Sequence, residues 1–170
     1  MAAEERVDER GDRVKILFEL AVDGRGWPPV RGEGMWASPL GQDTYRVASV
    51  PWFVCNIAEG DIVRAASLEN RSVPLFLERL SSGGSCTIRV MPFEDGPLKG
   101  DLGAVFEAFA PLGVSGERCG PWPLAALSIP PDADAAAVVG LLRAVAGGRC
   151  GRSLGIRARL RKQALALTLI

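Results

Sequence analysis

The sequence predicts a mixed α+β protein, with a β-rich small barrel or curled sheet in the N-terminal half and a ferredoxin-like β-α-β-β-α-β half after it. In residues 14–80, short β-rich stretches alternate with Gly, Pro and Asp turns, which is typical of a small barrel. Two segments with helical spacing of apolar residues, 101–109 and 133–146, occur only later and stand between predicted strands. The chain has 170 residues, of which 48 % are hydrophobic and 24 % charged, and this is an ordinary globular composition.

The N-terminal half begins with a predicted disordered tail, residues 1–13, because five acidic and three arginine residues there leave almost nothing apolar. A β-rich subdomain is expected over residues 14–80. Its predicted strands are 14–20, 33–37, 44–47, 52–55, 61–66 and 73–78.

The Ser-Ser-Gly-Gly stretch at 81–84 is the best internal boundary, and a second subdomain is expected over residues 85–170. Its helices would cover one face of an antiparallel sheet and leave the other face able to bind a partner. The predicted elements are a strand at 86–90, a helix at 101–109, strands at 114–119 and 124–129, a helix at 133–146 and a last strand at 154–160.

Histidine is absent, and this excludes serine–histidine and cysteine–histidine catalysis as well as metal sites built on imidazole. The four cysteines form no C-x-x-C pair, so we interpret them as reduced, mostly buried residues of a cytoplasmic protein. The alternative is a thiol nucleophile, for which Cys119 or Cys150 would be tested first. No secretory signal, membrane-spanning run or cofactor motif is recognisable, so no cofactor is expected.

The formal net charge of zero conceals an uneven distribution. Residues 135–170 carry seven basic and no acidic side chains, whereas residues 1–134 carry 13 basic and 20 acidic ones. In a strand, Arg157, Arg159 and Arg161 would share one face. This stripe is either solvated or compensated by the protein's own carboxylates, or else it binds an anionic partner. An acidic polypeptide suits it better than a nucleic acid, because the chain is neutral overall and no aromatic residue follows Trp122.

Several short motifs follow one another along the chain. They are Glu33-x-x-Trp36-Ala-x-Pro39-Leu40, Tyr45-Arg46 with Pro51-Trp52-Phe53, Gly60-Asp61-Ile62-Val63-Arg64-Ala65, the run 82–90, and Leu112-Gly113-x-x-x-Glu117. Taken in order, they resemble a bacterial family known only as domain of unknown function 4265. The resemblance covers roughly residues 14–150, and it implies a bacterial, cytosolic setting but no mechanism. The chain departs from the family pattern at Ser49, where Asn is usual, and in its arginine-rich C-terminal strand.

The polar residues of these motifs are the remaining candidates for chemistry. Asp61, Arg89 and Glu117 would form an acid–base site if they converged. The structural interpretation is that Asp61 ties a turn to its own backbone and that Arg89 pairs with Asp61 or Glu117. Glu33, Arg64 and Thr87 belong to the same set. Among the tryptophans, Trp36 and Trp52 are expected in the core, and Trp27 and Trp122 half-exposed along a groove.

These observations lead us to expect a non-catalytic accessory protein that recognises an acidic peptide or protein, such as a precursor peptide in a bacterial peptide natural-product pathway. Recognition would combine addition to a sheet edge with contacts from Arg152, Arg157, Arg159, Arg161 and Trp122. An exposed edge would also allow a homodimer. The alternatives are a regulatory module that binds a small acidic ligand between the two halves, and a carboxylate- or thiol-based enzyme.

Overall fold

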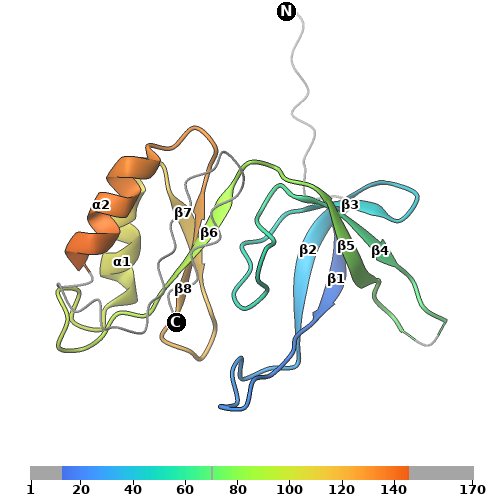
Figure 1. The fold of residues 1–170 in the computed structure, drawn as a ribbon, viewed down its shortest axis with the longest axis horizontal. Helices are drawn as coiled ribbons and strands as arrows, with labels where there is room; N and C mark the ends of the chain where they lie inside the picture. The colour runs from blue at the N-terminus through green and yellow to red at the C-terminus, as the bar shows by residue number, and fades with distance from the viewer. Residues whose placement is uncertain (1–12, 70, 146–170) are drawn as a thin grey trace, which may run out of the picture.

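The computed structural model describes residues 13–69 and 71–145, and there the chain forms a closed five-stranded barrel followed by a three-stranded sheet with helices (Figure 1). The predicted mixed α+β class is confirmed. The barrel comprises β1 (Val14–Glu19), β2 (Gly32–Gly41), β3 (Thr44–Val47), β4 (Ile62–Ala66) and β5 (Leu75–Ser81). The second part comprises β6 (Cys86–Val90), α1 (Leu102–Phe109), a 3-10 turn (Ala110–Leu112), β7 (Ser115–Arg118), β8 (Ala125–Ile129) and α2 (Ala135–Val145). Residues 1–12 of the predicted tail at 1–13 and the predicted strand at 154–160 lie outside the described residues.

The barrel is antiparallel from β1 through β5, and its closure is much weaker than its other strand pairs. β1 and β2 pair over six positions, whereas β1 and β5 are parallel and pair only at Leu17 and Leu75. Alternation of side chains along the strands directs Ile16, Phe18 and Met35 into the barrel core. The seam between β1 and β5 is therefore the place where the barrel is least closed.

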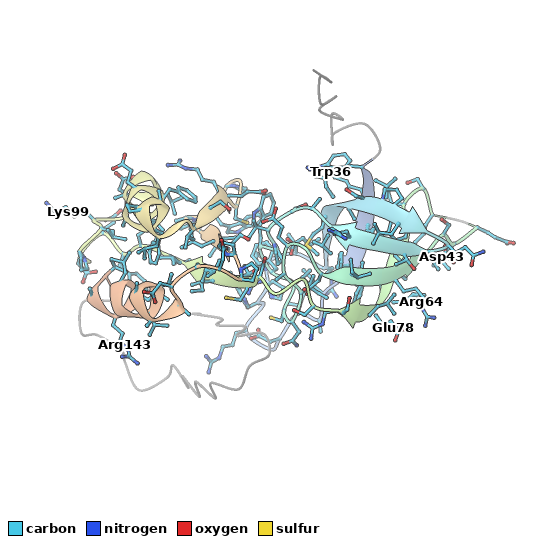
Figure 2. All side chains as sticks on the ribbon, turned by 90° about the horizontal axis from the view of Figure 1, so that it is seen from above. Trp36, Asp43, Arg64, Glu78, Lys99 and Arg143 are labelled. Atoms are coloured by element: carbon cyan, nitrogen blue, oxygen red, sulfur yellow. The ribbon has the colours of Figure 1, made fainter. Side chains whose placement is uncertain are left out.

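Trp36 was expected in the core, and this prediction is wrong. Glu33, Met35 and Ala37 take the inward positions of β2, so the alternation of the strand turns Trp36 outward. Its side chain is 47 % exposed, and Lys15 Nζ lies 5.2 Å from the centre of the ring. Trp36 therefore marks the outer surface of the barrel, where it is labelled in Figure 2.

The second part has the strand order β6-β8-β7, and its two helices cover one face of the sheet. Ile88 and Leu127, which pair across β6 and β8, pack in one core cluster with Val105 and Phe109 of α1 and with Val138 of α2. The opposite face is turned toward the barrel, so the sheet lies between the helices and the barrel (Figure 1). None of the described helices is long and apolar enough to cross a membrane.

Candidate functional site

A pocket of about 630 Å³ lies at the seam of the barrel, beyond the single pair that joins β1 to β5. Its lining includes the segments that leave this pair, residues 18–21 after β1 and Phe76 and Arg79 of β5. Asp23, Trp27, Pro28 and the loop 53–57 complete the lining. Four aromatic side chains are part of the lining: Phe18 stacks on Phe76 at 4.5 Å, and Trp27 meets Phe53 edge-on at 5.5 Å.

Trp27 reaches the pocket because Asp23 organises the turn that carries it. The Asp23 carboxylate accepts hydrogen bonds from the backbone N–H groups of Arg25 (2.8 Å) and Trp27 (2.9 Å). These bonds, the one from Trp27 first, hold the pKa of Asp23 below its ordinary value. The expectation that Trp27 would line a groove agrees with this placement.

A strand was predicted at 52–55, where the lining loop 53–57 begins, and that prediction is wrong. Three successive backbone N–H groups, those of Trp52, Phe53 and Val54, donate to the single carboxylate of Glu33 at 2.6, 2.8 and 2.9 Å. In a strand, successive N–H groups point in alternating directions, so three of them cannot meet one carboxylate. Glu33 is only 7 % exposed, and its place in the inward phase of β2 with Met35 and Ala37 was the sequence signal for this role.

Arg89 was expected to pair with Asp61 or Glu117, and the structure gives it different partners. Its Nε–H donates to the carbonyl oxygen of Trp52 and its Nη2–H to that of Val54. Glu117 lies on the same sheet face, but Ala126 stands between the two residues, so their backbones are about 10 Å apart. Burial lowers the pKa of the Arg89 guanidinium, and the nearby Cys55 and Glu33 act in the opposite direction.

Asp61 is fully buried and does tie a turn to the backbone, as expected, but it also fastens the junction between the two parts of the chain. Its carboxylate accepts the N–H of Ala58 at 3.0 Å and the N–H of Gly83 at 2.8 Å. Its ionic partner is Arg79 of the pocket, with Nη1 at 3.5 Å from Oδ2. Asp61, Arg89 and Glu117 therefore do not converge on a common acid–base site.

Glu117 faces the barrel from β7, in a position that disfavours its charge. Desolvation is the main cause of its raised pKa, and the nearby carboxylates of Glu59 and Glu33 add to it. Glu117 is not among the residues that line the pocket.

We expect Glu117→Gln to stabilise the protein slightly at neutral pH, by less than about 1 kcal/mol because solvent screens the side chain. Because the pKa of Glu117 is higher in the folded protein than its ordinary value of 4.5, its charge lowers the free energy of unfolding. This loss is absent below pH 4.5 and appears as the pH rises through the folded-state pKa. Urea unfolding of both proteins at neutral pH and well below pH 4.5 tests this. A gain that is equal at both pH values would contradict it.

The described cysteines differ sharply in exposure. Cys119 is buried, and desolvation raises its pKa to about 11, so its thiol is protonated and poorly suited to nucleophilic attack. Burial also raises the pKa of Cys86. Cys55 is exposed on the pocket wall. Cys150 lies outside the described residues.

Trp122, which was expected to contact a partner, packs between the two parts of the chain. It is half-buried and meets Phe53 edge-on at 5.6 Å, in a cluster that also contains Cys119 and Leu124. Trp52 is half-buried in the same cluster. The expected partner-binding arginines, Arg152, Arg157, Arg159 and Arg161, lie outside the described residues.

Two other polar candidates have no link to the pocket. Arg64 pairs with Glu78 on the outer end of the barrel, away from the helices (Figure 2). Thr87 is buried on the sheet face that bears Arg89. Within residues 13–69 and 71–145, three or more side chains able to hold a metal ion never come together.

Comparisons with known proteins identify a family and a shared fold. The family model described as Domain of unknown function (DUF4265) matches residues 33–149. A solved structure titled "Novel crystal structure of a hypothetical protein from Neisseria gonorrhoeae" is similar with a TM-score of 0.59 and 15 % identity. That similarity covers 78 % of this chain and 84 % of the other, and at this identity it shows the fold alone. No curated protein sequence matches the chain.

Proposed function

Because the chain belongs to the DUF4265 family, whose description states no activity, we propose its function from the site itself: it is a non-catalytic protein that binds an extended polypeptide segment. The binding site is the seam of the barrel between β1 and β5. The single observation that carries the proposal is that β1 and β5 stop pairing after Leu17 and Leu75, where the residues that follow line a pocket with four aromatic side chains.

The edge of β5 suits strand addition. Beyond Leu75, β5 pairs with β4 on one side, and within the described residues no strand pairs with its other side. Leu77 and Leu80 are half-exposed along this stretch, at 50 % and 49 %. An exposed apolar edge strand is a template for another chain, and main-chain hydrogen bonds to such an edge supply affinity with little dependence on sequence.

The pocket beside this edge suits an apolar side chain of the bound segment. Its volume lies within the range of ligand-binding pockets, and rings of Trp27, Phe53 and Phe76 line it. Arg79 adds a positive charge at the same wall, where its ion pair with Asp61 is long, 3.5 Å. A segment with an apolar residue next to an acidic one would match both features.

The non-catalytic character is supported by how the buried polar side chains are used. Glu33 and Asp61 accept hydrogen bonds from the backbone, and Arg89 donates to backbone carbonyl groups. Each of these side chains thus already serves the fold. Partially saturated groups in a cleft, as an acid–base enzyme requires, are not provided by these three residues.

The preference for an acidic partner rests on the sequence and on Arg79. The C-terminal arginines at 152, 157, 159 and 161 give the chain an excess of positive charge at one end. We propose that they contribute to the recognition of an acidic polypeptide in the bacterial cytoplasm, such as a precursor peptide of a natural-product pathway. The steering of acidic chains by such charge weakens as salt concentration rises.

We further propose that the second part of the chain is a ferredoxin-like unit. Its described strands follow the order β6-β8-β7, with α1 after β6 and α2 after β8. A ferredoxin-like sheet has a fourth strand beside the first, and β6 has no other partner strand among the described residues. The alternating segment 154–160 would supply this strand, and loss of slow amide exchange in β6 after its deletion would support the assignment.

The experiment selects ligands from random peptides of a dozen residues displayed on phage, and then titrates the selected peptides by calorimetry. We expect extended peptides with an apolar residue beside an acidic one. Cys55→Trp should weaken binding at least about tenfold, because Cys55 is exposed on the pocket wall and a larger side chain there obstructs the pocket without disturbing the core. Trp27→Ala should weaken it similarly.

Trp36→Ala is the matched control, since Trp36 is exposed on the barrel outside the pocket. This variant should leave the affinity unchanged within about twofold. In the unaltered protein, the backbone amides whose NMR signals shift on peptide addition should include those of residues 76–81. Selection that yields no binder, or binders unaffected by Cys55→Trp and Trp27→Ala, would overturn the proposal. If succinate shifts the same amide signals saturably and no peptide does, the ligand of the site is a small acid and not a polypeptide.

A further inference from the structure

One wall of the pocket is held from two directions by side chains of the two parts of the chain. On the barrel side, the Glu33 carboxylate of β2 accepts the N–H groups of Trp52, Phe53 and Val54. On the sheet side, the Arg89 guanidinium of β6 donates to the carbonyl oxygens of Trp52 and Val54. The three backbone N–H groups of this short segment thus bind to the barrel, and two of its three carbonyl groups bind to the sheet.

The same segment forms the pocket wall. Phe53, Val54 and Cys55 all line the pocket, and Phe53 makes an edge-on contact with Trp27, which also lines it. Arg89 itself is 2 % exposed and is not among the lining residues. It therefore acts on the pocket only through the backbone of the segment 52–54.

The guanidinium is well suited to this role, and an ammonium is not. Two N–H groups in a rigid planar fork reach two carbonyl groups of the same segment at once. A lysine in the same place keeps the charge but presents a single flexible donor group, and it cannot hold both carbonyls in one geometry. Charge and geometry at this position are thus separable by experiment.

We propose that Arg89 is a positioning residue of the polypeptide site, so that the site of the barrel is complete only when the second part of the chain is docked against it. This inference rests on the proposed function and adds that docking of the second part controls peptide binding. Whatever strengthens the contact of Arg89 with residues 52–54 strengthens peptide binding, and bound peptide strengthens that contact in return.

The test uses the full chain and measures amide hydrogen exchange by NMR. Arg89→Lys should accelerate exchange at the Phe53 and Val54 amides at least about tenfold, although the acceptor of both amides is Glu33 of the barrel. The amide of Val63, in the barrel core, should change by less than about twofold. Arg64→Lys is the matched control, because Arg64 lies on the outer end of the barrel (Figure 2) and should change neither rate.

Affinity for a selected peptide should fall at least about fivefold in Arg89→Lys and stay unchanged in Arg64→Lys. If Arg89→Lys does not fold, the Arg89 Nε–H signal of the unaltered protein replaces it. Hydrogen exchange of this Nε–H should slow when peptide saturates the barrel, because its hydrogen bond to the Trp52 carbonyl oxygen then breaks less often.

The outcomes distinguish this inference from the proposed function. Exchange rates at Phe53 and Val54 that stay within about twofold in Arg89→Lys would overturn the positioning role, whether or not peptides bind. An unaltered Nε–H signal under saturating peptide would also overturn it. Accelerated exchange together with a complete lack of peptide binding would retain Arg89 as the residue that orders the wall and would overturn the polypeptide proposal.

Discussion

Glu33→Ala is expected to lower the free energy of unfolding by roughly 3–5 kcal/mol, one of the two largest effects we predict for a single substitution. The substitution removes one carboxylate and leaves three backbone N–H groups without an acceptor, those of Trp52, Phe53 and Val54. Each of these bonds is charge-assisted, and a buried donor without an acceptor costs about 1–3 kcal/mol. Urea unfolding, followed by tryptophan fluorescence, measures the loss.

Two variants delimit the interpretation of this result. Glu33→Gln keeps an acceptor oxygen but places an NH₂ group against an N–H group, so its loss should be intermediate. Glu78→Ala removes an exposed carboxylate that pairs with Arg64, and it should change stability by less than about 1 kcal/mol. A loss below about 1 kcal/mol for Glu33→Ala would show that water replaces the carboxylate and that Glu33 does not hold the loop.

Gly83→Ala is the second large effect, with an expected loss of roughly 2–3 kcal/mol. A Cβ atom at residue 83 would lie 2.4 Å from both the carbonyl carbon and the carbonyl oxygen of Gly60. Those atoms belong to the backbone of a turn that Asp61 fixes, so neither side can move without losing the hydrogen bond from Gly83 N–H to Asp61. Thermal and urea unfolding of the purified variant measure the loss.

Gly140→Ala is the matched control and should have the opposite sign. Gly140 is exposed inside α2, and nothing lies within 4 Å of the position its Cβ would take. Replacing a helix-interior glycine by alanine stabilises by about 0.5–1 kcal/mol. Equal effects of the two alanines would refute the steric argument at Gly83.

The sequence was informative about features that depend on near neighbours. Alternating apolar residues indicated β1, β4 and β6 close to their observed bounds, because the period of a strand is written into consecutive residues. The helix predicted at 101–109 is observed at 102–109, and Asp101 caps it by accepting the N–H of Gly103. The hydrogen bond by which Asp61 ties its turn to Ala58 is equally local, because the two residues are three positions apart.

Features that depend on distant partners were missed. The residues of 52–55 are typical of a strand, but Glu33 is 19 residues before Trp52 in the chain and captures three of the amides. Arg89 donates to backbone carbonyl groups, and these exist at every position, so no sequence pattern marks the ones it selects. The pocket is equally invisible, because it results from the place where two strands cease to pair.

The hydrogen bond between Gly83 and Asp61 has a consequence for anyone who wishes to divide this protein. The stretch 81–84 reads as a flexible linker, and it is the obvious place to cut the chain for separate expression of the two parts. A cut there would remove the partner of one oxygen of a fully buried carboxylate, and it would strip Arg89 from the loop that it holds. Each fragment would lose hydrogen bonds that the other part supplies, so we expect the two parts to be stable only when they are produced together.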